Sequence, residues 1–154
     1  MPPELLTIGY EGCTIGGVLT TLKRERVDLL IDVRAVAASR KPGFSKRQLA
    51  AGLDRVGIGY VHFQRLGTPK PGRDAVRAGH PERMVPIFNH HMETVEARLA
   101  LTEATALAIE SRCCLLCFER DHRHCHRHLV AEMIVAKTRQ AIGHLEVPPE
   151  SLFP

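Results

Sequence analysis

The feature that most constrains the fold is the alternation of short apolar runs with segments of helical periodicity. Apolar runs suited to buried strands cover residues 5–8, 27–33, 58–63, 112–118 and 142–147. Between them, apolar residues recur at spacings of three and four, as on one face of a helix. Strands that alternate with helices favour a parallel sheet covered on both faces. We therefore expect an α/β protein, a Rossmann-like three-layer sandwich with a mainly parallel sheet of about five strands.

The length of 154 residues is typical of one domain. A chain of this size buries about two thirds of its unfolded surface and needs neither disulfide nor metal to fold. Hydrophobic content of 44% and charged content of 25% are ordinary for globular proteins. We expect residues 1–154 to form a single α/β domain.

The chain has no sequence signal for a membrane or for export. Its apolar runs are too short to cross a bilayer, and its first residues lack the basic and apolar regions of a signal peptide. The five cysteines are odd in number and irregularly spaced, so a disulfide framework is not expected. A reducing, cytoplasmic location fits this pattern, and no membrane partner is expected.

Local signals mark where some helices begin. Thr14 can cap a first helix, and residues 45–48 spell a capping box, supported by an apolar pair on either side. Residues 64–86 are rich in Pro, Gly and Arg and show no periodicity. They are either a lid or binding loop or a disordered surface segment. Pro86 is expected near the start of a helical region whose body covers about 93–110.

The net charge of +4 is unevenly distributed. Basic residues gather in two clusters, which suggests an anionic ligand without identifying it. The same residues could contact nucleic acid, although aromatic content of 5% with no Trp argues against base stacking. The clusters are Arg40, Lys41, Lys46, Arg47 and Arg55, and Arg65, Lys70, Arg73, Arg77 and Arg83.

Polar residues follow several of the expected strands, where parallel α/β sheets bind ligands. Gly9 and Tyr10 follow the first strand, and Gly9 would let a ligand approach the backbone. Asp32 and Arg34 leave the second strand on the same side; they form either a self-contained ion pair or part of a site, and we favour the site. Glu119, after the fourth strand, could act as a general acid or base, or bind ribose hydroxyls.

The densest polar segment, residues 121–128, precedes the last helix. A helix N-terminus favours anions. Cys125, among His and Arg side chains, lies where the pKa of a thiol can fall. Beside it are His126 and Arg127, and the guanidinium suits two-pronged binding of phosphate or carboxylate. The alternative is a helix start with a buried cysteine and solvated histidines.

A zinc site is not expected from the cysteines. Cys114 and Cys117 form a CxxC pattern near Cys125, but residues three apart on a strand point to opposite faces. A tetrahedral site would require that strand to break. We expect Cys117 to be a small buried apolar residue.

These residues resemble the domain of unknown function 488 family of small bacterial and archaeal proteins. The resemblance implies a Rossmann-like sandwich with the matching motifs at one sheet edge, and it supports Glu119, Cys125, His126 and Arg127 as a unit. It implies no particular activity. His122 follows Asp121 where the family often has Pro, which alters the stiffness of this loop rather than its chemistry. The matching pieces are Thr7-Ile8-Gly9-Tyr10, Asp32-Val33-Arg34, Ser39-Arg40, Phe44, Tyr60, Leu66-Gly67, Cys117-Phe118-Glu119 and Cys125-His126-Arg127.

The leading hypothesis is an enzyme, a hydrolase or transferase, that acts on a small anionic or nucleotide-like ligand. Residues 64–86 would cover the bound ligand. One alternative is a nucleic-acid-binding or accessory module that uses the basic clusters. The other is a thiol-based sulfur-transfer or redox protein centred on Cys125. The pattern specifies neither a cofactor nor an oligomeric state. Candidate catalytic residues are Asp32, Glu119, Cys125 and His126; candidate ligand-binding residues are Gly9, Tyr10, Arg34, Ser39, Arg40 and Arg127.

Overall fold

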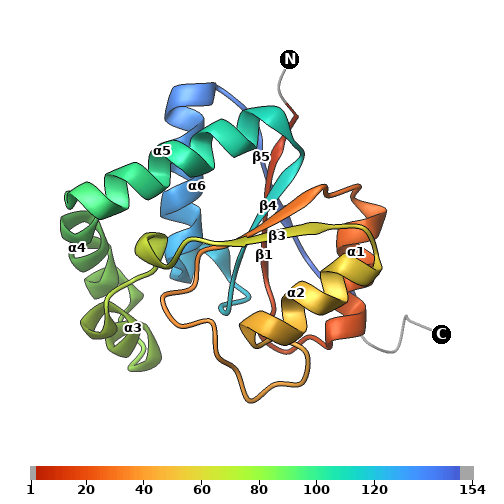
Figure 1. Cartoon of the computed structure of the whole chain (residues 1–154). Coiled ribbons are helices and arrows are strands. Elements are labelled where there is room, and N and C mark those ends of the chain that lie inside the picture. Colours follow the sequence, from red (N-terminus) through yellow and green to blue (C-terminus); the bar gives the residue numbers. More distant parts are fainter. Residues whose placement is uncertain (1–2, 150–154) are drawn as a thin grey trace.

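A computed structural model describes residues 3–149 as one five-stranded sheet with helices on both faces (Figure 1). All strand pairs are parallel, and the strand order is β3-β2-β4-β1-β5. The structure confirms the α/β class and the Rossmann-like sandwich. The strands are β1 (Leu5–Gly9), β2 (Leu29–Asp32), β3 (Gly59–His62), β4 (Cys113–Cys117) and β5 (Ile142–Leu145).

Two hydrophobic cores lie on opposite faces of the sheet. Helices α1 (Ile15–Arg24) and α2 (Lys46–Arg55) cover one face, whereas α5 (Val95–Glu110) and α6 (His126–Thr138) cover the other (Figure 1). Successive residues of β4 alternate between these cores and are all buried, which explains its continuous apolar sequence. The remaining helices are α3 (Lys70–Arg77) and α4 (Pro81–His91), with short 3-10 turns η1 (Gln64–Leu66) and η2 (His122–His124).

Strand β4 is inserted between β1 and β2, although it comes much later in the sequence. Gly9 pairs with Cys117 and Asp32 pairs with Leu116, so these strands end at nearly the same level. The chain leaves β1 and β2 toward the α1 and α2 face but leaves β4 toward the α6 face. Connections that diverge in this way open a crevice at the carboxyl ends of the strands.

The two expected helix starts have different outcomes. Thr14 caps α1, because its Oγ1 accepts the Gly17 N–H at 3.1 Å. Ser45 precedes α2 but makes no side-chain cap bond. Gln48 Oε1 instead accepts the N–H of Gly43 at 3.0 Å, two residues before Ser45. The predicted capping box is therefore wrong, because the turn before the helix uses the Gln48 side chain.

The segment expected to be an irregular loop is largely helical. It contains η1 and α3 and leads into α4, in which Pro86 lies inside the helix rather than near the start of one. Periodicity failed as a signal because these helices are short and bury few side chains: only Gly72 in α3, and Met84 and Phe88 in α4. Pro81 begins α4, where a missing N–H is harmless.

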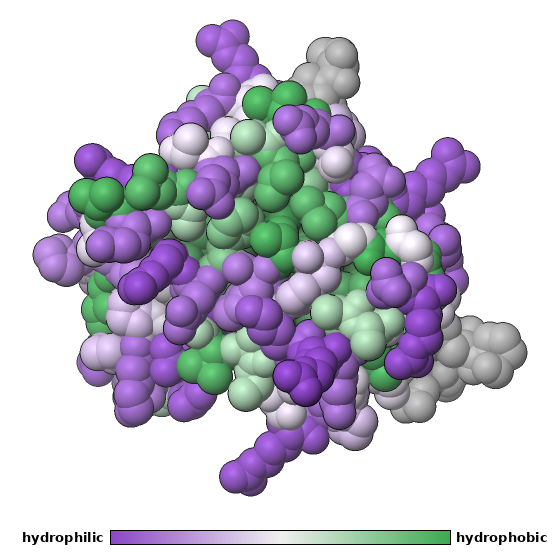
Figure 2. All heavy atoms as spheres, viewed as in Figure 1, coloured by the Kyte–Doolittle hydropathy of each residue, from purple (hydrophilic) through white to green (hydrophobic). Residues whose placement is uncertain are grey.

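Among the described helices, none combines the length and apolar character needed to cross a bilayer. Apolar side chains are interspersed with polar ones on the face seen in Figure 2. The large exposed apolar residues include Val95, Leu99 and Ile109, all on α5.

Candidate functional site

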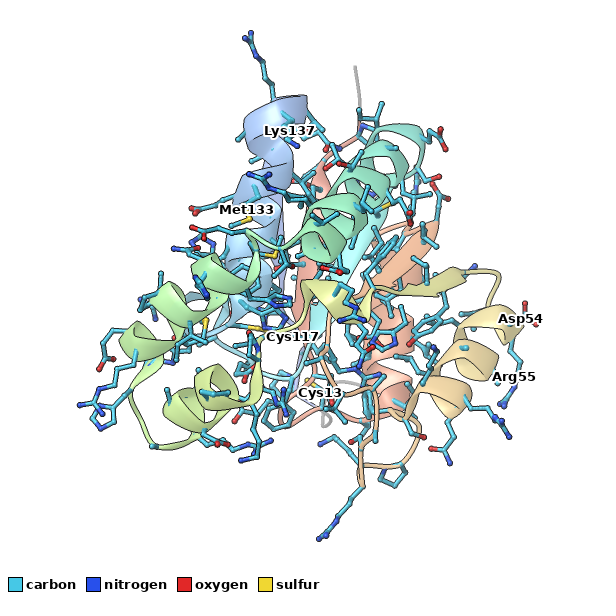
Figure 3. All side chains as sticks on the ribbon, turned by 60° about the vertical axis from the view of Figure 1, so that its left-hand side comes forward. Cys13, Asp54, Arg55, Cys117, Met133 and Lys137 are labelled. Carbon is cyan, nitrogen blue, oxygen red and sulfur yellow. A yellow bond between two sulfur atoms is a disulfide. The ribbon has the colours of Figure 1, made fainter. Side chains whose placement is uncertain are left out.

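A cavity of about 630 Å³ opens at the carboxyl edge of the sheet. Its lining comes from the segments after β1, β2 and β4 and from the region of α3, so chain segments far apart in sequence meet there. Cys117 lies near the middle of the molecule at this edge (Figure 3). The lining residues are Tyr10, Glu11, Arg34, Ala35, Val36, Ala38, Ser39, Thr68, Arg73, Val76, Arg77, Met84, Cys117, Phe118, Glu119, His124 and His126.

The wall formed by α3 offers donors to an anion. Arg73 and Arg77 both line the cavity. One guanidinium nitrogen of Arg73 donates to the Thr68 carbonyl at 2.9 Å, which leaves its other N–H groups available. Arg77 is largely exposed, and its nearest ion-pair contact is Asp74 at 3.7 Å. The Thr68 hydroxyl is buried and has no hydrogen-bond partner within residues 3–149. A buried hydroxyl without a partner is costly, so this wall is suited to a ligand that accepts hydrogen bonds.

Asp32 and Arg34 form a closed network beside the cavity. Arg34 binds both carboxylate oxygens of Asp32, at 2.9 and 2.7 Å, and its Nη1 donates to the Tyr10 hydroxyl at 3.1 Å and to the Phe44 carbonyl at 2.7 Å. The Tyr60 hydroxyl donates to Asp32 at 2.6 Å. Asp32 is fully buried. The protein itself thus occupies most of the hydrogen-bonding groups of this pair, which fixes the loop after β2.

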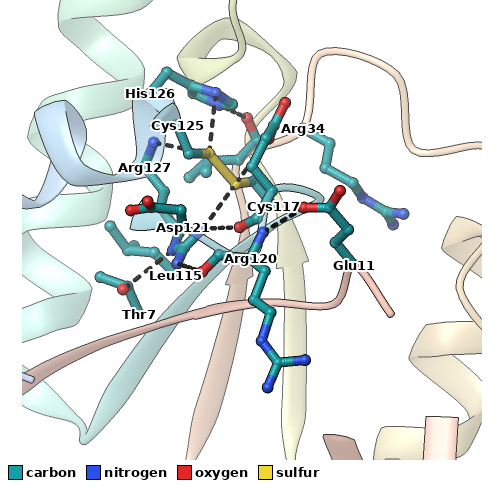
Figure 4. Close-up of a disulfide and its surroundings, with 12 residues drawn as sticks. Thr7, Glu11, Arg34, Leu115, Cys117, Arg120, Asp121, Cys125, His126 and Arg127 are labelled. Atoms are coloured by element: carbon teal, nitrogen blue, oxygen red, sulfur yellow. Dashed lines mark hydrogen bonds between the residues drawn. A yellow bond between two sulfur atoms is a disulfide. The ribbon is translucent and has the colours of Figure 1, made fainter. Parts of the chain in front are cut away.

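Arg127 is also used within the protein. It is 1% exposed, and its Nε donates to Thr7 Oγ1 at 3.1 Å. Its terminal nitrogens donate to the carbonyl oxygens of Glu119 and Arg120, the latter at 3.3 Å (Figure 4). Burial lowers the pKa of Arg127. The guanidinium therefore holds the backbone of the loop after β4.

Gly9 permits the close approach of that same loop. A β-carbon on Gly9 would collide with the carbonyl oxygen of Glu119 and would lie 2.8 Å from Arg127 Nη1. The sequence predicts that a ligand approaches the backbone at Gly9, whereas in this structure the group that approaches it is the backbone carbonyl of Glu119.

Cys117 and Cys125 form a disulfide beneath the cavity (Figure 4). Both cysteines are buried, with Cys117 1% and Cys125 2% exposed. Cys117 belongs to the cavity lining, and Cys125 caps α6, with its sulfur accepting the Arg127 N–H at 3.5 Å. The expectation of Cys117 as a simple apolar residue is wrong, because the loop after β4 brings Cys125 back against it. Of the two cysteines, Cys117 is the one in the described lining of the cavity.

Two ionisable side chains flank the disulfide. Glu119 Oε2 lies 3.5 Å from Cys117 Sγ, and burial raises the pKa of this carboxyl. His126 Nε2 lies 2.7 Å from the Val33 carbonyl oxygen and donates to it, which directs Nδ1 toward Cys125 Sγ at 3.8 Å. Burial lowers the pKa of His126 to about 4, so the imidazole is neutral near pH 7. The site thus combines a carboxyl that binds protons more readily than usual with a neutral imidazole.

The remaining candidates lie on the segment after β2. Ser39 lines the cavity, and its hydroxyl accepts the Lys41 N–H at 3.1 Å. Arg40 is exposed and does not belong to the described lining. Glu11, which follows Tyr10 at the end of the first strand, lines the cavity, whereas sequence reasoning missed Thr68. The charge pattern had included Arg73 and Arg77 in a basic cluster, but only the position of α3 singles them out.

Two groups of side chains within the described residues could hold a metal ion. The first consists of Cys117, Cys125 and His126, but its sulfurs are joined to each other and offer no thiolate in this state. The second consists of His122, His128 and His144. His144 lies on β5, outside the polar segment recognised in the sequence.

Comparison with known proteins gives one match. The family model described as "Domain of unknown function DUF488" matches residues 14–134, which include every element from α1 to β4 and most of α6. No curated protein and no solved structure shows a significant match to the chain. The matched region contains the cavity wall on α3, the disulfide and the carboxyl of Glu119.

Proposed function

The chain belongs to the DUF488 family, and we propose that it is an enzyme acting on a small anionic or nucleotide-like ligand, with Glu119 as its acid–base group. One observation carries the proposal. A carboxyl whose pKa is raised by burial lies in a cavity of about 630 Å³, and Arg73 and Arg77 line that same cavity. Cavities of this volume hold ligands of metabolite size.

The lining suggests how such a ligand would be held. Arg73, Arg77 and the free Thr68 hydroxyl would bind the anionic end. Phe118 lines the cavity, is 46% exposed and meets Tyr10 edge to face at 5.4 Å. Its ring could contact a planar or apolar part of the ligand. Glu119 would then give a proton to, or take one from, the reacting group, as in a hydrolase or transferase.

The test begins with native mass spectrometry of the protein as purified, followed by turnover of a panel of phosphate esters and nucleotides. We expect Glu119→Gln to abolish turnover while the far-UV circular dichroism spectrum stays unchanged. Arg77→Gln should weaken substrate binding, whereas Arg83→Gln, an exposed arginine of α4 outside the described lining, should not. A fully active Glu119→Gln protein would remove the acid–base role. Binding of nucleic acid with affinity that falls steeply with salt would instead favour the basic clusters.

A second candidate function is thiol–disulfide exchange, favoured by the disulfide at the cavity. An incoming thiolate would attack Cys117 Sγ, the S–S bond would break, and its electron pair would leave with Cys125 as a thiolate. The Arg127 N–H and the start of α6 would stabilise that thiolate. A second thiol would resolve the mixed disulfide, so two thiols are oxidised and one disulfide is reduced. We also propose a cytoplasmic location, where disulfides are usually redox-active rather than structural.

Trapping distinguishes this candidate from the first. In Cys125→Ser, glutathione disulfide should form a stable mixed disulfide at Cys117, because the resolving thiol is gone. In Cys117→Ser, Cys125 should react far more slowly, because it lies outside the described cavity lining. Equal trapping of both variants, or exclusive trapping at Cys125, would contradict the exchange at Cys117. Turnover by Cys117→Ser on the substrate panel would leave the acid–base enzyme as the function.

A further inference from the structure

Three histidines from separate segments meet beside the edge strand β5. His122 belongs to η2, His128 to α6 and His144 to β5. The rings of His122 and His144 stack with centroids 3.6 Å apart, and the ring of His128 lies 5.4 and 5.7 Å from them. One nitrogen from each ring lies within 4.8 Å of the others. The described lining of the cavity contains none of the three, so this is a separate group.

His128 is held as metal-binding histidines are. Its Nε2 lies 3.2 Å from Glu132 Oε1, one turn further along α6, so the ring donates from Nε2 to the carboxylate. The other nitrogen, Nδ1, is buried and has no hydrogen-bond partner in the described part of the chain. A buried nitrogen with a free lone pair is costly unless something binds it. A carboxylate that fixes one nitrogen while the other stays free is the usual outer arrangement around a metal ligand.

His144 is anchored in a similar way. Its Nδ1 lies 2.6 Å from Thr7 Oγ1, which also accepts the Arg127 Nε–H. The Thr7 hydroxyl can donate to Nδ1 or accept from it, depending on the tautomer of His144. In the tautomer that suits a metal ion, His144 donates from Nδ1 to Thr7 and its Nε2 carries the free lone pair.

From this arrangement we propose that His122, His128 and His144 bind one divalent transition-metal ion, zinc by preference, with water as the fourth ligand. Three imidazoles and an open position suit tetrahedral zinc. Zinc–nitrogen distances of about 2.0–2.1 Å place the three nitrogens about 3.4 Å apart. Because an imidazole binds a metal in the plane of its ring, the rings of His122 and His144, now only 5° from parallel, must turn out of their stack on binding. His122 makes this adjustment most easily, because it lies on the short turn between β4 and α6. The bound ion would join that turn, α6 and β5.

The test uses the full chain, stripped with chelator and titrated with zinc by calorimetry and with cobalt by visible absorption. Wild type should bind one equivalent, and cobalt should give the spectrum of a tetrahedral site with nitrogen and oxygen ligands. His128→Gln and His122→Asn should each lose stoichiometric binding. Glu132→Gln should weaken binding by about 10- to 100-fold, because it removes the group that orients His128. His124→Gln, on the same turn but outside the cluster, should bind as wild type does.

Three results would overturn the proposal. One is an absence of stoichiometric binding by folded wild type. Another is retention of binding by both His128→Gln and His122→Asn. The last is a thiolate-to-cobalt absorption band in wild type together with loss of binding in Cys117→Ser, which would assign the metal to the cysteine group. Thermal unfolding of each stripped variant checks that folding survives, and His122→Asn keeps the test decisive if His128→Gln does not fold.

Discussion

Arg127 contacts Glu119 through the backbone carbonyl of Glu119 and makes no ion pair with the Glu119 carboxylate. The guanidinium donates to the carbonyl oxygen of Glu119, while the carboxyl group of the same residue turns toward Cys117. No ion pair to this carboxyl exists among residues 3–149, and burial is the largest influence on its pKa. One residue thereby fixes the loop, and the carboxyl stays ready to bind a proton.

Replacing the buried Arg127 should destabilise the protein more than replacing the exposed Arg123. Arg127→Met leaves buried carbonyl oxygens without donors, at a cost of about 2–4 kcal/mol in the free energy of unfolding. Urea denaturation measures this difference. Arg123→Met is the control, because Arg123 is exposed and its pairing with Asp121 at the surface should contribute little. Equal midpoints for the two variants would contradict the structural role of Arg127.

The raised pKa of Glu119 makes its contribution to stability depend on pH. The folded protein binds this proton more tightly than the unfolded chain does. The free energy of unfolding therefore falls as pH rises from the ordinary glutamate range through the raised folded value. Glu119→Gln should accordingly unfold at higher urea than wild type at pH 7, with the difference shrinking toward pH 4. A variant less stable than wild type at pH 7 would show that the ionised carboxylate is stabilised by the fold.

Two glycines should respond to alanine in opposite directions. Gly9→Ala forces a β-carbon against the Glu119 carbonyl and should destabilise the protein by about 1–3 kcal/mol. Gly16→Ala, in α1 with open space around it, should stabilise the protein by about 0.5–1 kcal/mol. Thermal denaturation of both variants provides the comparison. If Gly9→Ala is tolerated as well as Gly16→Ala, the loop after β4 does not pack on β1 as described.

The unpartnered Thr68 hydroxyl should contribute to ligand binding and not to the stability of the ligand-free protein. Thr68→Val keeps the shape and removes the buried hydroxyl, so the ligand-free protein should gain up to about 1 kcal/mol in stability. Stabilisation by inorganic phosphate or sulfate, measured as a shift in Tm, should become smaller in this variant. An unchanged phosphate shift would separate Thr68 from anion binding.

Thiol counting tests the disulfide directly. Of the five cysteines, Cys13, Cys113 and Cys114 are free, so the unreduced, denatured protein should take up three iodoacetamide groups and the reduced protein five. In the native state these three should label slowly. Burial raises the pKa of Cys13, and it raises that of Cys113 to about 12. Mass spectrometry gives the count, and five groups without reductant would contradict the disulfide.

The sequence predicted the fold better than it predicted the site. The strands were found because each is a continuous apolar run, and β4 needs one since both its faces are buried. α3 and α4 were missed because they bury too few side chains to leave a periodic pattern.

The site residues show why geometry was needed. The motif residues Asp32, Arg34 and Arg127 were recognised, but their type and spacing could not reveal that the protein itself occupies their hydrogen-bonding groups. Cys117 was taken for an apolar residue because the turn that returns Cys125 to it has no sequence signature. Thr68 carries no signal at all, since only the packing around it leaves its hydroxyl unpartnered.

The late insertion of β4 also governs how the sheet can assemble. β1 and β2 do not pair with each other, and each pairs with β4 instead. Until residues 113–117 are available, a growing chain leaves both edges of β1 and the inner edge of β2 unpaired, because β5 also comes later in the sequence. Such edges invite wrong pairing and aggregation. A fragment ending at residue 111 should therefore fail to form a continuous sheet, and completion of the core must await the segment that also delivers Cys117 to the cavity.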